Sequence, residues 1–480
     1  MNKVISILKK ICAVVVACAM ICSVPAVSAN ATVTSAGNIA KGIDVSRYQG
    51  TIDWAKVANS GIKFAFVRIG NTFGGLDPTF EYNITQAQAN GIKVGVYLYS
   101  YAKSDEEAAI EAQLTLAWLG AHGLQLPVVY DVEDKCHSAM TTEALYSMIN
   151  TYCAIIDAAG FYPMVYTYKN FYHGKLGTSP WDKWMAQYGD ALNTNETVAF
   201  WQYSSSGSVP GISGRVDMDY QYKDYSNLII NEGFIEHNGA TRFYRGYRMQ
   251  YGWIDFNNQR YYADLFGNIQ KSWFLDADGS MYFMDVATGA MQKGLVSISG
   301  FDFYFDQASG VQQFGFVDYG SGNKYFDPTM NGAMAKSWFA YNGEMHYAKS
   351  NGDQAIGITD IDGAKYFFDD NGALVMNQIV TVGKTQYQAG MDGILVEIPK
   401  IAPAAGEESN GIVNGIDISK ISLATGLYYD DTSMQWINPY TGKVVDEKGA
   451  PIEGATADPV LIANLQMAMS MLTQAAGVAQ

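Results

Sequence analysis

The chain has 480 residues, of which 48% are hydrophobic and 16% are charged, so it is long enough for at least two globular domains. Its formal net charge of −16 works against binding to phosphate backbones or anionic lipid surfaces. We therefore expect neither a nucleic-acid partner nor insertion into a membrane.

The first 29 residues have the pattern of a secretory signal peptide. Three lysines precede an apolar run from 11 to 24, and Val27-Ser28-Ala29 supplies the small residues of a cleavage site. Cys18 comes too early in the apolar run for a lipoprotein signal, and no later stretch is apolar enough to span a bilayer. Cleavage would leave a secreted, extracellular chain with charge −19, from 28 basic and 47 acidic residues. It would also leave two cysteines, Cys136 and Cys153, whose pairing the sequence leaves open.

Residues 41–234 alternate between strand-like and helix-like patterns. The predicted strands are 42–45, 64–69, 94–101, 128–133, 164–168, 183–188, 198–203 and 216–220, and the predicted helices are 53–58, 80–90, 104–119 and 141–159. Alternating strands and helices favour a parallel sheet, and eight is the number of strands in a closed barrel. Because the last three strands have little helix between them, we predict an α/β fold with an irregular (β/α) TIM-like barrel.

Carboxylates gather at the strand ends of this predicted barrel. An apolar strand ends in Asp131 and Glu133, which share one face about 6.6 Å apart because each strand residue rises about 3.3 Å. Asp44 ends the first strand, while Asp217 and Asp219 lie in the eighth, its neighbour in a closed barrel. An acidic pair at a strand end is often only solvated. The convergence of several acids on one mouth favours acid–base chemistry instead.

Aromatic residues follow the same strands. Rings with a polar group can stack on sugar rings and hydrogen-bond to hydroxyls, although many rings in a barrel pack its core. The predicted substrate-binding residues are Tyr97, Tyr99, Tyr166, Trp184, Gln187, Trp201 and Tyr203. No cysteine or histidine spacing is typical of a metal site, so neither a metal nor a cofactor is expected.

Four motifs occur in order between residues 41 and 230. They are Gly42-Ile43-Asp44-Val45-Ser46 with Gln49-Gly50 and Ile52-Asp53-Trp54, then Tyr130-Asp131-Val132-Glu133, then Trp201-Gln202-Tyr203-Ser204-Ser205, and finally Val209-Pro210-Gly211-Ile212 with Val216-Asp217. Together they resemble glycoside hydrolase family 25, the secreted and phage-type lysozymes. The resemblance implies that the barrel, at 41–234, cleaves the β-1,4 bond between N-acetylmuramic acid and N-acetylglucosamine in peptidoglycan.

The resemblance also implies roles for four carboxylates. Glu133 is the general acid, Asp131 lies beside it, and Asp44 and Asp217 complete the acidic cluster. In the family, Asn often stands two residues after the last aspartate, where this chain has Asp219, so the choice between the last two acids stays open. The strand spacing falls between those of retaining and inverting glycosidases and does not decide the stereochemistry. Our hypothesis is the substrate-assisted route, in which the 2-acetamido oxygen of the substrate attacks and Asp131 orients or stabilises it.

A different pattern covers residues 244–396. Glycines recur at steps of 20 to 22 residues, and an aromatic pair precedes most of them. Such a period predicts a solenoid of stacked β-hairpins, each too small to bury a core alone. The units resemble bacterial cell-wall-binding repeats of the choline-binding and glucan-binding type, which implies wall polymers as partners, with choline or glucan as candidates. The candidate wall-binding residues are Trp253, Tyr262, Trp273, Tyr282 and Trp338. The alternative is that these rings only pack one hairpin against the next.

Residues 400–409 are rich in Ala, Pro and Glu and are predicted to be a linker. The tail, 410–480, has no functional interpretation, although Pro459 is placed to begin a helix that reaches 476.

The leading hypothesis is therefore a secreted peptidoglycan hydrolase that its repeats hold on the bacterial cell wall. One alternative is a hydrolase of another N-acetylhexosamine polymer, such as chitin. The other is an inactive wall-binding protein or adhesin, which the presence of all four acidic positions disfavours.

Overall fold

The computed structural model describes residues 31–34, 37–176, 179–194, 196–320, 322–398, 411–413, 415–422 and 425–477. The chain divides into two compact units, one reaching to Lys271 with Ala287–Ala290 added, the other comprising Ser272–Val286 and the residues from Met291 onward. The predicted signal peptide and the predicted linker lie outside the described residues. Within the described residues, no helix is both long and apolar enough to cross a membrane.

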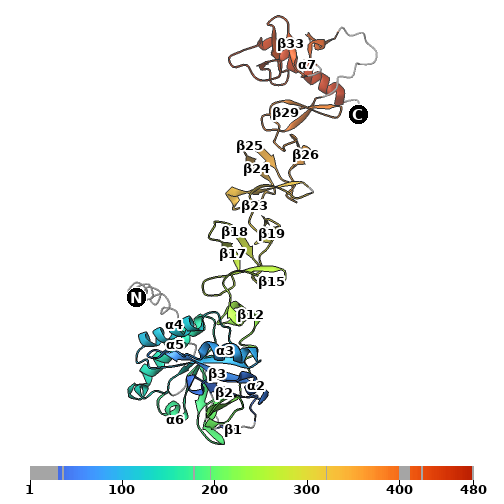
Figure 1. Ribbon diagram of the computed structural model, residues 1–480. Helices are drawn as coiled ribbons and strands as arrows, with labels where there is room; N and C mark the ends of the chain where they lie inside the picture. The colour runs from blue at the N-terminus through green and yellow to red at the C-terminus, as the bar shows by residue number, and fades with distance from the viewer. Residues whose placement is uncertain are drawn as a thin grey trace. The chain divides into compact units, whose positions relative to one another are not determined.

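Eight strands of the first unit close into a barrel (Figure 1). They are β2 (Ala40–Val45), β3 (Phe64–Asn71), β5 (Lys93–Tyr99), β6 (Val128–Asp131), β7 (Pro163–Tyr168), β8 (Asp182–Ala186), β10 (Phe200–Gly207) and β11 (Val216–Gln221). Their order is β2-β11-β10-β8-β7-β6-β5-β3, and β2 pairs with β3 to close the ring. All eight predicted strands are present.

The sheet is mixed, which corrects the expectation of a parallel sheet. β11 runs antiparallel to both of its neighbours, β10 and β2. The connection from β10 to β11, residues 208–215, is too short for the crossover that a parallel pair needs, so the chain turns back on itself. As a result, β11 begins at the end of the barrel where β2 finishes.

Four helices follow strands as the sequence predicts. They are α2 (Trp54–Asn59), α3 (Phe80–Ala89), α4 (Asp105–Leu119) and α5 (Thr142–Ala158). Ser104 caps α4, because its hydroxyl accepts a hydrogen bond from the backbone N–H of Glu107 at 3.3 Å. After β7 only α6 (Lys169–Phe171) and the turn Tyr172–Leu176 are helical among the described residues of the barrel. The final third of the barrel is therefore irregular, as predicted, and the description TIM-like is approximate.

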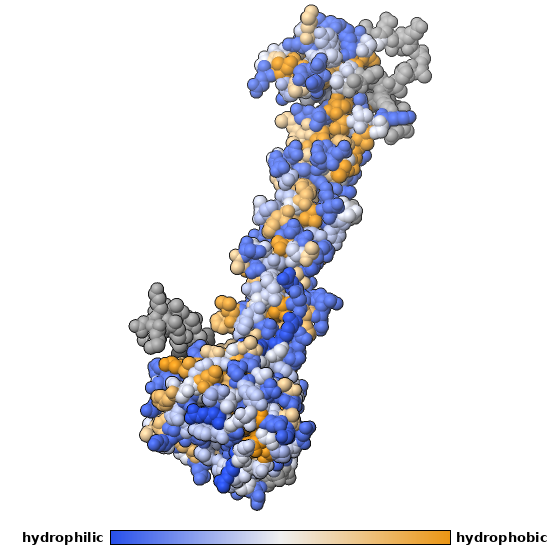
Figure 2. Space-filling model, viewed as in Figure 1, coloured by the Kyte–Doolittle hydropathy of each residue, from blue (hydrophilic) through white to orange (hydrophobic). Residues whose placement is uncertain are grey.

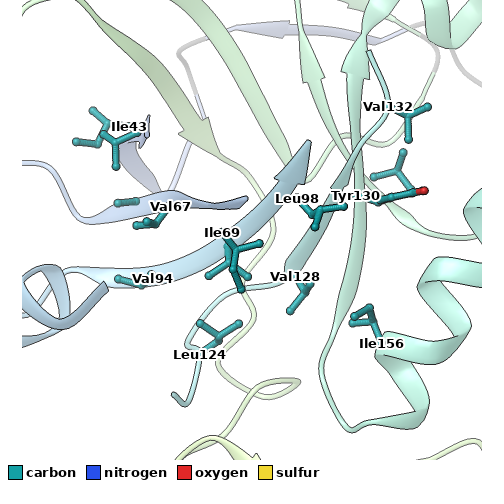
Figure 3. Close-up of a cluster of buried hydrophobic side chains, with 14 of the residues drawn as sticks. Ile43, Val67, Ile69, Val94, Leu98, Leu124, Val128, Tyr130, Val132 and Ile156 are labelled. Carbon is teal, nitrogen blue, oxygen red and sulfur yellow. The ribbon is translucent and has the colours of Figure 1, made fainter. Parts of the chain in front are cut away.

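Strand alternation divides the hydrophobic core into two layers. Val128 and Tyr130 of β6 point outward toward the helices, where Ile156 of α5 packs in the same cluster (Figure 3). Val129, between them, points into the barrel and packs with Phe66 and the other rings of the interior. The next inward position is Asp131, so the apolar interior gives way to carboxylate at the end of the strand.

Short strands complete the first unit. β4 (Gly75–Leu76) extends β3, and β1 (Ala31–Thr34) pairs with β9 (Ala191–Thr194). β12 (Glu232–His237), β13 (Ala240–Arg245) and β14 (Arg248–Met249) form a small sheet, followed by the hairpin of β15 (Gly252–Phe256) and β16 (Gln259–Ala263). The first hairpin strand thus begins at Glu232, within the range predicted for the barrel.

The second unit begins as a series of hairpins. They are β17 (Ser272–Leu275) with β18 (Met281–Met284), β19 (Gly294–Ile298) with β20 (Phe301–Phe305), β21 (Gly315–Asp318) with β22 (Asn323–Asp327) and β23 (Ala333–Met334), β24 (Trp338–Tyr341) with β25 (Glu344–Tyr347), β26 (Gly357–Ile361) with β27 (Ala364–Phe368), and β28 (Ile379–Val382) with β29 (Thr385–Ala389) and β30 (Leu395–Ile398). Apolar side chains reach the surface along the hairpins (Figure 2), among them Leu275 and Val286.

The periodic glycines lie where one hairpin meets the preceding one. Seven of them adopt the left-handed φ that favours glycine, and a Cβ on each would collide with an upstream side chain. At Gly352, for example, φ is +84° and a Cβ would lie 2.4 Å from Sδ of Met334. The seven are Gly267, Gly289, Gly310, Gly332, Gly352, Gly372 and Gly393. The period in the sequence is therefore a packing period.

The tail has a small core of its own. Its strands are β31 (Ile412–Val413), β32 (Ile416–Asp417), β33 (Tyr428–Asp430), β34 (Gln435–Ile437) and β35 (Val444–Val445), and α7 (Pro459–Gly477) follows at the predicted position. Leu465 and Ala468 of the helix pack with Ile416, Tyr428 and Ile437 of the strands.

Candidate active site

The pairing of β2 with β11 brings three carboxyl groups onto one face. Asp44 and Asp217 lie opposite each other in the antiparallel register, and Asp219 lies opposite Gly42, two residues deeper in the barrel. All three point inward, since Ile43 and Met218 between them pack in the outer layer. Asp219 is fully buried, whereas Asp217 is partly exposed. Of the two acids that the sequence left open, Asp217 is therefore the one that solvent and ligands reach.

Asp131 and Glu133 enter the same mouth from β6. Asp131 is the last residue of the strand and is 3% exposed, while Glu133 lies just beyond it and is partly buried. Among the described residues, neither Oδ1 of Asp131 nor Oε2 of Glu133 has a hydrogen-bond partner, although both atoms are buried. Buried polar atoms are normally paired, so these two oxygens are placed for a ligand. Together with Asp44, Asp217 and Asp219 they form what we call the acidic cluster.

Gln202 of β10 links the cluster to the tyrosines of the mouth. Its Nε2 donates to Oδ2 of Asp44 at 2.8 Å, and its Oε1 accepts from the hydroxyls of Tyr166 at 3.0 Å and Tyr188 at 3.2 Å. The Nε1–H of Trp184 likewise donates to Oδ1 of Asp219 at 2.8 Å. Gln202 stands in the Trp-Gln-Tyr motif of a predicted strand, and the signal that could have identified it is that strand alternation places a polar residue on the face opposite to Trp201 and Tyr203.

Burial raises the pKa of every carboxyl group in the acidic cluster. It raises the pKa of Asp217 to about 6. For Asp44, the charges of Asp219 and Asp217 add to the effect of burial. The cluster as a whole therefore holds protons at a pH where ordinary carboxyl groups are ionised.

Different neighbours act on the pKa of Asp131, at the end of β6, and on the pKa of Glu133, just beyond it. Burial and the charge of Glu133 raise the pKa of Asp131, and the positive charge of Arg68 works against that rise. Burial raises the pKa of Glu133, and the hydroxyls of Tyr168 and Tyr166 work against it. Arg68 favours ionisation of the deeper acid, Asp131, and Glu133 stands nearer to the opening.

Four of the predicted substrate-binding aromatics point into the barrel. The ring of Trp184 lies 4.5 Å from that of Tyr166 and 6.1 Å from that of Tyr97, measured between centroids. Trp184 is 1% exposed and packs beneath the mouth, so it holds the acids in position and has almost no surface for a ligand to contact. Tyr99 is partly exposed, and its hydroxyl donates to Oδ2 of Asp134 at 3.2 Å.

Trp201 and Tyr203 do not line the mouth. Phe200 and Gln202 occupy the inward positions of β10, so strand alternation turns Trp201 and Tyr203 to the outer face. There Tyr203 stacks on Tyr220 at 4.2 Å. The prediction that these two bind substrate overlooked this alternation.

Gln187 supports β10 through its backbone. Its carbonyl oxygen accepts from Nε1 of Trp201 at 2.8 Å, and its N–H donates to the carbonyl of Gln202 at 3.2 Å. The side-chain Oε1 is buried and has no hydrogen-bond partner among the described residues.

The comparisons with known proteins agree with this geometry. The model of the glycosyl hydrolases family 25 matches residues 43–212. An uncharacterised protein of Escherichia coli K12, YegX, is 33% identical over 190 residues, which are 37% of this chain and 68% of that protein. The N,O-diacetylmuramidase of Arthroderma benhamiae is 30% identical over 193 residues, 37% of this chain and 74% of the relative. The chain belongs to glycosyl hydrolases family 25.

The autolytic lysozyme of Clostridium acetobutylicum is 29% identical over 198 residues, 41% of this chain and 58% of that protein. The family 25 match ends before the hairpins begin, so it concerns the barrel alone.

Exposed aromatics flank the acidic cluster of the family 25 barrel on two sides. Tyr168 and Tyr188, 41% and 48% exposed, stand with their rings 6.5 Å apart. Tyr48 and Phe73, 73% and 80% exposed, extend from the segments after β2 and β3. Neither Tyr48 nor Phe73 belongs to a predicted strand, so no pattern in the sequence selects them.

Within the described residues, no group of three or more His, Cys, Asp or Glu side chains is arranged to hold a metal ion. Cys136 and Cys153 are both free thiols, and Cys153 is buried in α5.

Two of the aromatics predicted to bind the wall, Trp273 and Trp338, lie between hairpins. The ring of Trp273 meets Phe283, its partner across the hairpin, and Phe303 of the next hairpin at centroid distances of 5.2 and 5.0 Å. Trp338 meets Tyr347 and Tyr366 in the same way, at 5.2 and 5.0 Å. In the remaining predicted pair, Trp253 meets Tyr262 at 5.3 Å, and Tyr282 is 8% exposed. Trp273 and Trp338 therefore pack neighbouring hairpins together, whereas Trp253 and Tyr262 meet within one hairpin, and Trp273 keeps 38% of its surface exposed.

Proposed function

We propose that the barrel hydrolyses the β-1,4 bond between N-acetylmuramic acid and N-acetylglucosamine in peptidoglycan. The observation that carries this proposal is the acidic cluster itself, five carboxyl groups at the open end of a family 25 barrel between two pairs of exposed aromatics. Two matched relatives are named as an autolytic lysozyme and an N,O-diacetylmuramidase.

Glu133 is proposed as the general acid. Burial raises its pKa, which favours the protonated form that a general acid needs, and its place near the opening suits donation to the leaving glycosidic oxygen. Asp131 lies deeper, where burial and the charge of Glu133 raise its pKa and the positive charge of Arg68 works against that rise. An ionised Asp131 can orient the 2-acetamido group of the substrate and stabilise the positive charge that develops when its oxygen attacks the anomeric carbon.

Asp44 and Asp217 face each other across the β2–β11 pair, and Asp217, whose pKa is raised to about 6, supplies further negative potential beside the developing oxocarbenium ion above that pH. Gln202 holds the Asp44 carboxylate in position. The route retains the anomeric configuration, because the acetamido oxygen and then water attack in succession. Proton NMR of the first product tests it, and an inverted anomer would exclude the route.

Fragment analysis tests the proposed bond. Peptidoglycan digested with the full chain should yield fragments whose new reducing ends are N-acetylmuramic acid. New reducing ends on N-acetylglucosamine, or faster cleavage of chitin oligomers, would support a hydrolase of another polymer. No cleavage of any glycan, with binding to walls retained, would support the wall-binding or adhesin alternative.

We further propose that the chain is exported and that its hairpins hold it on the wall. The lysine-apolar-small pattern of residues 1–29 supports export, and the aromatic clusters around Trp273 and Trp338 support binding of wall polymers. Co-sedimentation of the full chain with purified walls, followed by elution with choline or with soluble glucan, distinguishes the two ligand candidates.

A further inference from the structure

One rim of the mouth carries positive charge, although the chain as a whole is strongly acidic. Arg47 and Tyr48 follow β2, Arg68 lies near the end of β3, Phe73 stands on the turn after it, and Tyr101 follows β5. We call these five residues the cationic rim. None of the five is a carboxyl group to which the proposed hydrolysis assigns a chemical step.

The rim is rigidly built. A single carboxylate, Asp77, 3% exposed, accepts from Nε of Arg68 at 3.1 Å and from the backbone N–H of Arg47 at 3.2 Å. The turn that carries Arg47 and Tyr48 is also closed by a capping box between Ser46 and Gln49. These contacts fix two segments of the mouth relative to each other before any ligand arrives.

The two guanidinium groups flank one exposed ring. Cζ of Arg47 lies 5.2 Å and Cζ of Arg68 lies 5.4 Å from the centroid of Tyr48. Both charges lower the pKa of the Tyr48 hydroxyl, the hydrogen bond from Arg47 first. Tyr48 is nevertheless 73% exposed, so the ring and the charges beside it face solvent together.

The charges of the rim do not cancel. Asp77 pairs with Arg68, whereas Arg47 forms no ion pair with any residue that the structure describes. One positive charge is thus left at the edge of a mouth that otherwise holds carboxyl groups. Arg68 also acts on Asp131, which makes the rim continuous with the acidic cluster.

Phe73 and Tyr101 add an apolar ledge. Their rings lie 4.8 Å apart, and Tyr101 meets Tyr99 at 5.1 Å. Phe73 is 80% exposed, yet its backbone N–H is held by Oδ1 of Asn71 at 3.0 Å. A large apolar ring fixed in solvent beside a catalytic mouth is a contact surface for a ligand.

We propose that the cationic rim binds the acidic peptide substituent of the glycan. This inference rests on the proposed function, since in peptidoglycan the N-acetylmuramic acid carries a peptide with free carboxylates. Such a peptide would be repelled by the acidic cluster and by the net charge of −16 unless a cation lay where the peptide leaves the mouth. Arg47 supplies that cation, and the ledge of Phe73 and Tyr101 takes the aliphatic part of the peptide.

The test measures binding, so that it does not depend on turnover. The probes are two soluble uncrosslinked peptidoglycan strands, one with free peptide carboxylates and one with the same carboxylates converted to carboxamides. Their dissociation constants are measured by calorimetry at low salt on full-length Glu133→Gln and on the same chain with Arg47→Gln. Arg47 is exposed, so the substitution leaves the fold intact.

We expect the Glu133→Gln chain to bind the free-carboxylate strand about 3 to 10 times more tightly than the amidated strand, a preference that falls at high salt. Arg47→Gln should bring the ratio toward one, and Arg47→Lys should restore it. Lys63→Gln, which removes an exposed charge at the start of β3, is the matched control and should keep the ratio.

A ratio near one before substitution, or a ratio that Arg47→Gln does not change, overturns the inference. Equal weakening of both strands by Arg47→Gln would mean that the rim binds sugar and not the peptide, which also overturns it. Failure of the wild-type chain to cleave either strand would reject the proposed hydrolysis, and the binding ratio would still decide the inference.

Discussion

Asp44 and Asp217 stand at opposite ends of the barrel sequence and lie face to face because β2 and β11 close the sheet. Gly352, in contrast, meets Met334 of the hairpin just before it. The barrel assembles its site from long-range pairing, whereas each hairpin depends on its nearest neighbour. A change in the barrel mouth should therefore act on chemistry with the hairpins intact, and a change at a hairpin glycine should act locally with the barrel intact.

Glu133→Gln should have the largest effect. Removing the proposed acid should lower lytic turnover about 10²- to 10⁴-fold, because the leaving oxygen then departs without a proton. Co-sedimentation with walls should stay at the wild-type level, because wall binding is assigned to the hairpins and Glu133 lies in the barrel. Turbidity clearing and co-sedimentation on the same walls measure the two properties. Undiminished lysis would reject the assignment of Glu133, and joint loss of lysis and binding would contradict the separation of the two regions.

Gln202→Leu should come next. It removes the hydrogen bond to Asp44 and leaves the hydroxyls of Tyr166 and Tyr188 without their acceptor. We expect kcat to fall about 10- to 100-fold, because a hydrogen bond to a charged group contributes about 1.5–3 kcal/mol. KM should change less than kcat.

Gln221→Leu is the matched control for that variant. Gln221 is also a buried glutamine, and its Nε2 donates to the carbonyl of Lys223 at the other end of β11. Gln221→Leu should lower the free energy of unfolding without changing kcat per folded molecule. If both variants lower kcat equally, Gln202 has only a structural role.

Periodicity and alternation account for what the sequence predicted in this molecule. The eight strands and four helices followed from apolar runs and cap residues, and the periodic glycines marked the hairpin contacts. The direction of β11 did not follow, because it depends on a short connection whose course no local pattern reports. Trp201 was chosen for its chemistry, and the structure shows that it lies on the outer face because its neighbour Phe200 points into the barrel.

For the site as well, residues at strand ends could be predicted from the sequence and residues on turns could not. The convergence of Asp44, Asp131, Glu133 and Asp217 on one mouth could be predicted because strand ends meet in a barrel. Arg47 and Phe73 lie on turns, and their role depends on what neighbouring turns bring beside them. Sequence reasoning about single strands has no access to such contacts.

Gly352→Ala should destabilise one part of the hairpin series. The left-handed φ costs an alanine about 1 kcal/mol, and displacement of Met334 by the new Cβ adds about 1–2 kcal/mol. Gly343→Ala is the matched control, because φ is +83° there and a Cβ would meet no atom within 4 Å. Hydrogen exchange of hairpin peptides should show a larger loss of protection for Gly352→Ala than for Gly343→Ala. Equal losses would mean that φ alone explains the glycine period, and changed exchange in barrel peptides would contradict local coupling.

Asp217→Asn should have the smallest effect, and that effect depends on pH. Burial raises the pKa of Asp217 to about 6, above its unfolded value of about 3.9, so its contribution to stability is full at low pH and is lost as the pH rises through 6. The substitution should therefore stabilise the barrel relative to the wild type by about 1–2 kcal/mol at pH 7.5, after allowance for solvent screening, and by little at pH 4. Urea unfolding of both proteins in parallel from pH 4 to 8, followed by tryptophan fluorescence, measures the difference.

Asp53→Asn is the control, because Lys56 lowers the pKa of that exposed carboxyl and no gain at high pH is expected. An increase in the free energy of unfolding of Asp217→Asn that is the same at every pH would show that the asparagine packs better and that the buried charge of Asp217 costs nothing. The electrostatic contrast between the barrel mouth and the hairpins would then be lost.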